Sequence, residues 1–348
     1  MSYQLKKIPQ DFIVKEVSLE PDLLAYEKSQ YTYLLLKKIG FSTFDAIENV
    51  ANYFNLSDDN ISSQGLKDED GVTYQTISIK KLLLSEDLLN FNKLCNETNN
   101  LIQLENIIGY GEKEVKAALL HGNVFSLTIR NLEPAVINDF NNYFKKKKLI
   151  SFVNYYDSQR FGIIGNIMNS YLIGENLVKH NWRKAYDQFI ISGDKRPKID
   201  NLSLFGNKNK IINFFHNLNT SRINFFVSSY NSWLWNKATS EYLKTNKKSK
   251  VCNFSSLGDL YLTGDTDQEL KNIMSSPGYK INTKDFSINQ KTCSRNIVTS
   301  TKIFLLYGGQ DELNQGKEKI KISFFLPAGS YATMLVRQLF WQLNDNKS

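Results

Sequence analysis

An acidic cluster flanked by two glycines contains the residues of this sequence that are best suited to chemistry. Residues 65–75 read GLKDEDGVTYQ, and Lys67 directly precedes Asp68. A nearby ammonium favours the ionised carboxylate, which is the form that a carboxylate nucleophile requires. Residues 76–79 then alternate polar and apolar side chains, as in a half-buried strand. The pattern predicts a turn that leads into a strand and presents Asp68 to a cleft, with a solvated acidic turn as the alternative.

Metal binding is not expected from this cluster. In a calcium loop set on Gly71, the first and last ligands would be Leu66 and Ile77, and neither side chain can coordinate a cation. The three cysteines of the chain are widely spaced, and its three histidines have no partner at metal-ligand spacing. The sequence therefore indicates neither a metal site nor a disulfide framework.

The elements that must position the cluster can be predicted from the spacing of apolar residues. Ser42 and Thr43 can cap a helix whose apolar residues extend to Phe54. We expect a turn at Gly308-Gly309-Gln310 and a helix that begins at Gly329-Ser330. The other predicted strands span residues 12–17, 31–39, 101–108, 121–130 and 320–325, and the other predicted helices span residues 85–94, 169–177, 183–190 and 225–243.

Composition favours an intracellular protein with an acidic partner. The 348 residues carry 43 Lys and Arg against 35 Asp and Glu, which gives a net charge of +8. Such an excess suits a polyanion, and the 22 Phe and 18 Tyr include rings on which unpaired bases could stack. The N-terminus lacks the apolar core of a signal peptide, and no stretch approaches the length of a membrane span. We expect a soluble, cytoplasmic protein.

Several segments resemble the TruD family of tRNA pseudouridine synthases. GLKDEDGVTYQ is similar to the family pattern Gly-Leu-Lys-Asp-x-x-Ala-Val-Thr-x-Gln. LKKIPQDFIVKEV resembles the family's opening, and residues 38–43 fit its Lys-x-x-x-x-Thr step from strand to helix, to which we assign packing only. The other matching segments are GNVFSLTIR at 122–130, NYYDSQRFG at 154–162 and LPAGSYATMLVRQL at 326–339.

The resemblance implies roles for individual residues. Asp68 would be the nucleophile, with Lys6 as its ion partner and Lys67 and Asn123 in close support. Phe125 would be the ring on which a flipped uracil stacks, with a place in the core as the alternative. The further residues implied to bind substrate are Gln75, Asn154, Gln159, Arg160, Phe161, Ser330 and Arg337.

The chain departs from the family pattern at Tyr156, Asp157 and Gln338, and Glu69 occupies one of its variable positions. By resemblance the fold is α/β of the α+β type: a mostly antiparallel mixed central sheet flanked by helices, with an inserted second α/β domain. The expected segments are a catalytic part at 1–155, the insert at 156–300 and a C-terminal catalytic part at 301–348.

The implied activity is the isomerisation of uridine 13 in the D arm of tRNA to pseudouridine. The reaction involves neither redox change nor hydrolysis, so no cofactor is expected, and we expect a monomer that acts on tRNA. A non-catalytic RNA-binding protein or tRNA chaperone on the same scaffold is the alternative. An RNA methyltransferase is disfavoured, because no Gly-rich strand-to-helix turn for its cofactor is present.

Overall fold

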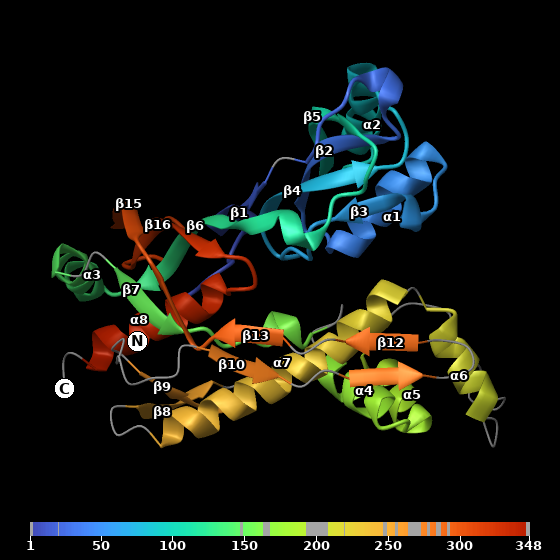
Figure 1. Cartoon of the computed structure of the whole chain (residues 1–348). Coiled ribbons are helices and arrows are strands. Elements are labelled where there is room, and N and C mark those ends of the chain that lie inside the picture. The colour runs from blue at the N-terminus through green and yellow to red at the C-terminus, as the bar shows by residue number, and fades with distance from the viewer. Residues whose placement is uncertain are drawn as a thin grey trace. The chain divides into compact units, whose positions relative to one another are not determined.

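The chain divides into two compact units, which are described separately (Figure 1). The first comprises Met1–Ile150, Ser300–Gly329 and Leu343–Ser348, and the second comprises Ser151–Thr299 and Ser330–Gln342. The segments 1–155, 156–300 and 301–348 stay a prediction about domains. The structure is a computed structural model and describes residues 3–19, 21–146, 149–162, 168–192, 208–218, 220–245, 249–254, 257–263, 273–276, 279–282, 287–290 and 293–345.

A mixed eight-stranded sheet forms the centre of the first unit, with the strand order β15-β16-β6-β1-β4-β2-β5 and β3 beside β4. The β1–β4 pair is parallel, and the other pairs described in this sheet are antiparallel. This confirms the mostly antiparallel mixed sheet. The strands are β1 (Phe12–Ser18), β2 (Tyr31–Ile39), β3 (Ile61–Ser63), β4 (Val72–Ile79), β5 (Ile102–Gly111), β6 (Leu120–Leu132), β15 (Ile303–Gln310) and β16 (Glu318–Pro327).

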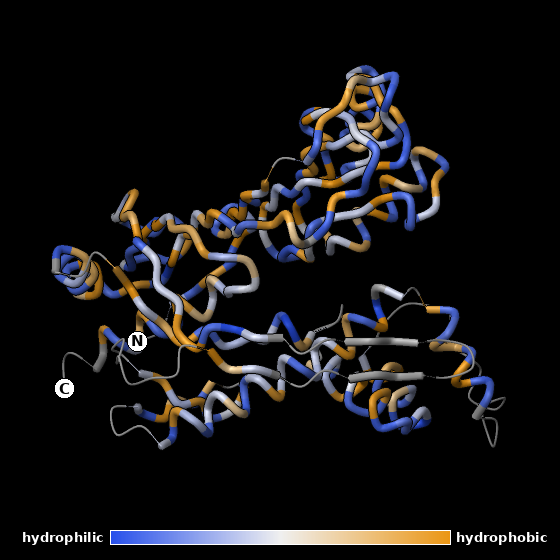
Figure 2. Tube along the Cα trace, viewed as in Figure 1, coloured by the Kyte–Doolittle hydropathy of each residue, from blue (hydrophilic) through white to orange (hydrophobic). Residues whose placement is uncertain are grey.

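Two helices, α1 (Thr43–Phe54) and α2 (Ser85–Glu97), pack against β2, β4 and β5. The Ser42 side chain caps α1 by accepting a hydrogen bond from the Asp45 N–H, as the sequence predicts. One buried cluster joins apolar side chains of both helices to those of the three strands. Hydrophobic and hydrophilic residues alternate along these elements, which is the pattern of a sheet with a covered face (Figure 2). A third helix, α3 (Pro134–Lys146), contacts β16.

The turn predicted at Gly308-Gly309-Gln310 is wrong, because these residues end strand β15. Gly308 and Gly309 lie opposite Ile320 and Lys319 of β16 in an antiparallel ladder. Glycine is disfavoured in a strand by its backbone entropy, and pairing with a long neighbouring strand overrides that preference.

Helices and short strand pairs form the second unit. Aromatic and aliphatic side chains of α4 to α7 share one buried cluster, so these helices have a common core. The helices predicted at 169–177, 183–190 and 225–243 are found, and the third begins earlier than predicted. The helices are α4 (Ser170–Val178), α5 (Trp182–Ile191), α6 (Lys208–His216) and α7 (Thr220–Lys244).

Short strand pairs contact two of these helices. Strand β8 (Lys250–Phe254) pairs with β9 (Gly258–Leu262), β10 (Ile273–Ser276) with β13 (Cys293–Asn296), and β11 (Tyr279–Asn282) with β12 (Ser287–Gln290). Of these strands, β9, β10 and β12 contact α7, and β11 contacts α4. Strands β7 (Ile150–Val153) and β14 (Val298–Thr301) lie where the chain passes between the units, and α8 (Ala332–Asp345) follows β16. In the basic runs at 145–148 and 244–250, residues 147, 148 and 246–248 lie outside the described residues.

Candidate active site

The candidate catalytic loop is the connection between β3 and β4, and its end lies against β1. A Cβ atom added to Gly71 would lie 2.4 Å from the backbone oxygen of Phe12, closer than real Cβ atoms come to any neighbour. Only glycine therefore fits at this position. From Gly71 the chain enters β4, where Val72 pairs with Ile13 of β1. This close approach fixes the loop at the junction of two inner strands.

Asp68 and Lys6 form an ion pair on this loop. The Lys6 Nζ lies 2.5 Å from Asp68 Oδ1 and 3.8 Å from Asp70 Oδ2. It also lies 4.4 Å from the centroid of the Phe12 ring, a cation–π distance. The Asp68 side chain is 12% exposed, so its charge is held in a largely enclosed place. The structure thus brings together the predicted nucleophile and its predicted ion partner.

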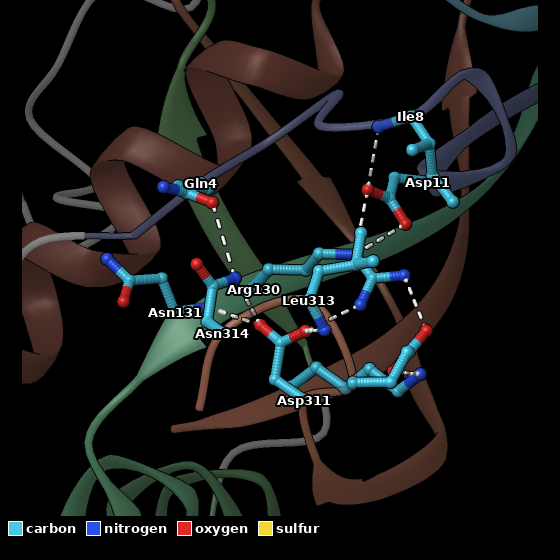
Figure 3. Close-up of polar contacts among 10 residues, drawn as sticks. Gln4, Ile8, Asp11, Arg130, Asn131, Asp311, Leu313 and Asn314 are labelled. Carbon is cyan, nitrogen blue, oxygen red and sulfur yellow. Dashed lines mark hydrogen bonds and ion pairs between the residues drawn. The ribbon is translucent and has the colours of Figure 1, made fainter. Parts of the chain in front are cut away.

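The N-terminal segment that carries Lys6 is fastened at both of its ends (Figure 3). The backbone groups of Gln4 and Arg130 exchange two hydrogen bonds of 2.9 Å. Arg130 Nε also donates to both carboxylate oxygens of Asp11 at 2.9 Å, and Asp11 accepts from the Ile8 N–H at 3.2 Å. Between these anchors Lys6 has a φ of 57°, in the left-handed region that few residues adopt. The local fold therefore dictates where the Lys6 side chain begins.

Two further carboxylates bind Arg130: Glu312 Oε1 accepts from Arg130 Nη2 at 3.1 Å, and Asp311 makes a larger set of hydrogen bonds (Figure 3). Asp311 is the buried one of the two. The Asp311 carboxylate accepts from Arg130 Nη1 at 2.7 Å and from the Asn131 N–H at 2.9 Å. It also accepts from Asn314 Nδ2 at 2.7 Å and the Leu313 N–H at 3.1 Å. Burial alone would raise the pKa of Asp311, but these hydrogen bonds outweigh it and lower the pKa to about 2.

Lys67 does not point its charge at Asp68. Its Nζ lies 2.6 Å from Oε1 of Glu16 on β1, and both side chains are almost fully buried. The other oxygen of Glu16 accepts from the Thr76 N–H at 2.7 Å. Glu16 thereby ties the loop and β4 to β1. Glu16 lies in the segment LKKIPQDFIVKEV that resembles the family's opening, and this is the sequence signal for it, although the sequence alone did not indicate its role.

Gln75 and Asn123 are buried close to the loop and to β1. Gln75 is fully buried, and its Oε1 accepts from the Thr43 hydroxyl at 3.2 Å. Asn123 pairs with Glu16 in the β1–β6 ladder and is 8% exposed. Among the described residues, neither Gln75 Nε2 nor Asn123 Oδ1 has a hydrogen-bond partner. Such buried atoms are free to bond a ligand that approaches them.

Phe125 is 4% exposed and belongs to a set of three rings. Its ring stacks on Phe324 of β16 at 5.5 Å and meets Phe12 edge-on at 6.1 Å. In the sheet it lies opposite Val14 on β1 and Phe324 on β16. The ring therefore contributes to the core of the first unit, and its role as a stacking platform stays a prediction.

The remaining predicted residues belong to the second unit and are described within it. Asn154 is buried, and its side-chain oxygen accepts from Arg295 Nη2 at 2.8 Å. Arg160 is half-buried and donates to the hydroxyls of Ser232 at 3.0 Å and Ser228 at 2.7 Å on α7. Gln159 is exposed, whereas Phe161 is fully buried.

Ser330 lies two residues before α8, and Arg337 lies within that helix. The Ser330 hydroxyl is buried and has no hydrogen-bond partner among the described residues. Helix α8 begins at Ala332, two residues later than predicted. Arg337 Nη2 lies 3.5 Å from Asp157 Oδ1. Gln338, where the family has Glu, bonds both backbone groups of Val153, at 2.8 Å and 2.7 Å.

The described residues offer neither a cluster for a metal ion nor a helix for crossing a membrane. They contain no group of three or more His, Cys, Asp and Glu side chains that could hold a metal ion. None of the helices in the described ranges combines the length and the hydrophobicity that a membrane-spanning helix needs.

The first unit is an α/β fold whose loop into the inner strand β4 carries an enclosed, lysine-paired aspartate, and such a side chain can act as a carboxylate nucleophile. Similarity to known proteins identifies the enzyme family. Residues 1–200 match the family model described as tRNA pseudouridine synthase D (TruD). The chain therefore belongs to the TruD family of tRNA pseudouridine synthases, which makes it an isomerase.

Similar proteins extend the match over nearly the whole chain. A tRNA pseudouridine synthase D from Aquifex aeolicus is 26% identical, covering 98% of each protein. One from Leptospira interrogans is 28% identical, covering 97% of this chain and 96% of the relative. The crystal structure of a protein described as a TruD from Methanosarcina mazei aligns with a TM-score of 0.53 at 21% identity, over 96% of this chain and 92% of that one. The last comparison shows that the fold is shared.

Proposed function

We propose that this protein isomerises uridine 13 in the D arm of tRNA to pseudouridine, with Asp68 as the nucleophile. The observation that carries the proposal is the 2.5 Å pair of Lys6 Nζ and Asp68 Oδ1 on the loop of the family's signature motif. The position in tRNA follows from the resemblance of that motif. The net charge of +8 suits a tRNA partner.

The chemistry that the site must perform is an exchange of bonds within one nucleotide. The N1–C1′ bond of uridine breaks, the base rotates, and a C5–C1′ bond forms while C5 loses a proton and N1 gains one. A carboxylate that bonds covalently to the nucleotide divides this exchange into two easier steps. Asp68 supplies the carboxylate, and the Lys6 ammonium beside it stabilises the charged form that attacks.

The base must leave its stack before Asp68 can reach it. Extrusion of a base costs a few kcal/mol, which contacts in the pocket offset. The Asn123 Oδ1, buried and without a partner among the described residues, is a group that can bond the edge of the uracil. Phe125, which lies opposite Val14 in the β1–β6 ladder, would supply the ring on which the base stacks.

The test compares the wild-type protein with Asp68→Asn on one tRNA transcript. Pseudouridine at position 13 is mapped by carbodiimide modification and primer extension, and tRNA affinity is measured by filter binding. We expect wild-type protein to form pseudouridine and Asp68→Asn to form none, with equal affinities and melting temperatures. Turnover by Asp68→Asn would refute the nucleophile. A wild-type protein that binds tRNA and modifies no uridine would instead support a chaperone.

A further inference from the structure

The segment from the end of β2 to the start of α1 forms hydrogen bonds with the backbone of the catalytic loop at three consecutive residues. The hydroxyl of Thr43 accepts from the Lys67 N–H at 3.0 Å. The ammonium of Lys38 donates to the Asp68 carbonyl at 2.6 Å. The Gly40 N–H donates to the Glu69 carbonyl at 3.1 Å. One neighbouring segment therefore bonds the Asp68 carbonyl itself and the backbone of the residue on either side of it.

Lys38 is an unusual group to find in this place, because it is fully buried. Its Nζ donates to two backbone carbonyls, that of Asp68 and that of Phe41 at 2.7 Å. The pKa of Lys38 is lowered to about 8: burial lowers it most, the charges of Asp68 and Glu69 oppose this, and those of Lys67 and Lys6 add to it. A buried ammonium is unfavourable unless its hydrogen bonds are satisfied, so these two carbonyls define its position.

The hydroxyl of Thr43, like the ammonium of Lys38, makes two hydrogen bonds. Thr43 is the first residue of α1, directly after the capping residue Ser42. Its hydroxyl accepts from the Lys67 N–H and donates to Gln75 Oε1, so both roles of the hydroxyl are used. The loop is thus bonded to the start of a helix, which is a rigid part of the scaffold.

We propose that Lys38 and Thr43 are positioning residues for the nucleophile. Lys38 fixes the carbonyl of Asp68 and Thr43 fixes the N–H of the preceding residue, so that the Asp68 carboxylate stays directed at the reacting nucleotide. The inference rests on the proposed function of Asp68. Neither residue touches substrate in this account, and each acts through the loop backbone. A small misplacement of a nucleophile lowers the rate strongly, because the reacting atoms must be aligned.

Two variants of Thr43 form the sharpest test. Thr43→Val keeps the shape of the side chain and removes the hydroxyl, whereas Thr43→Ser keeps the hydroxyl. The single-turnover rate of pseudouridine formation and the tRNA affinity are measured for each. We expect Thr43→Val to slow the reaction roughly tenfold or more, the effect of one lost hydrogen bond on alignment. We expect Thr43→Ser to stay within about threefold of wild type, with unchanged affinity in both.

Lys38→Met and its neighbour Lys37→Met form a second pair. Lys37 is on the same strand, but its side chain is 24% exposed and its Nζ donates to Gln103 at 2.9 Å, away from the loop. We expect Lys38→Met to lose roughly a hundredfold in rate, and Lys37→Met to stay within about twofold. If Lys38→Met does not fold, the Thr43 pair decides.

Three results would overturn the inference: a folded Thr43→Val with the wild-type rate, equal rate losses in Thr43→Val and Thr43→Ser, or a rate loss explained by weaker tRNA binding. Asp68→Asn is assayed alongside these variants. If it retains turnover, the proposed function of Asp68 fails first. If it is inactive while Thr43→Val is normal, only the positioning inference fails.

Discussion

Arg130 on β6 and Asp311, the residue after β15, are separated by 181 positions in the sequence and lie 2.7 Å apart. The Asp311 side chain has no exposed area, and that of Arg130 is 4% exposed. The same guanidinium binds Asp11, so one buried charge joins the N-terminal segment to the β15–β16 connection. The segment that it joins is the one that carries Lys6.

Replacing Arg130 by Met should destabilise the first unit severely. Breaking a buried ion pair from one side costs about 3–5 kcal/mol, because the carboxylates of Asp11 and Asp311 stay buried without their partner. Chemical unfolding measures the loss. Arg183→Met is the control, because Arg183 pairs with Asp187 at the surface of α5 and such a pair contributes about 0.3–0.5 kcal/mol. Equal effects of the two changes would contradict this account.

Asp311 should make stability depend on pH in the acid range. Its pKa is lowered from 3.8 to about 2 in the folded protein, so its contribution is complete above pH 5 and is lost as the pH falls towards 2. By linkage the contribution is roughly 2 kcal/mol. The free energy of unfolding of wild type, minus that of Asp311→Asn, should shrink by this amount between pH 5 and pH 2. A difference that stays constant over this range would refute the prediction.

Lys6→Met should slow catalysis while the protein stays folded. The change removes the ammonium that lies 2.5 Å from Asp68, and hydrogen bonds to charged groups contribute about 1.5–3 kcal/mol. That range corresponds to a roughly tenfold to hundredfold slower single turnover. Lys7→Met is the matched control, because Lys7 is the next residue and is exposed. If both variants react at the wild-type rate, the Lys6 ammonium does not assist catalysis by Asp68.

Phe125 should matter for both stability and turnover, since it is buried among two other rings. Phe125→Leu removes the ring and keeps an apolar side chain, and we expect it to lower stability by about 1 kcal/mol. Phe91→Leu, a buried ring of α2, should have a similar effect on stability. Turnover per folded molecule should fall in Phe125→Leu alone, by up to the 1–3 kcal/mol or so of a lost base–aromatic contact. Equal turnover in the two variants would assign Phe125 to the core alone.

Local patterns were sufficient to predict the elements around the loop. Strand β2 spans the predicted residues 31–39. The polar residue before it and the glycine after it indicate where the strand begins and ends. Helix α1 begins after Ser42 as predicted, because a capping side chain is a local signal. Gly308 and Gly309 were misread because their strand depends on pairing with β16, which no local pattern contains.

The contacts of the site could not be predicted from local patterns. Lys6 and Asp68 are 62 positions apart, and only the family resemblance linked them. The role of Lys38 was missed, since a lysine in a strand normally reaches solvent, and the carbonyl that binds it belongs to a loop 30 positions away. Buried polar contacts of this kind depend on the tertiary fold and not on spacing.

The close approach of Gly71 to β1 limits how this protein can be engineered. The family pattern has Ala where this chain has Gly71. A design that replaces unusual residues by the commonest ones in relatives would introduce that methyl group 2.4 Å from the Phe12 oxygen. Strand β1 would have to move away, and it carries Glu16, the partner of Lys67. Consensus substitution, which stabilises many proteins, would here displace the backbone beside the nucleophile.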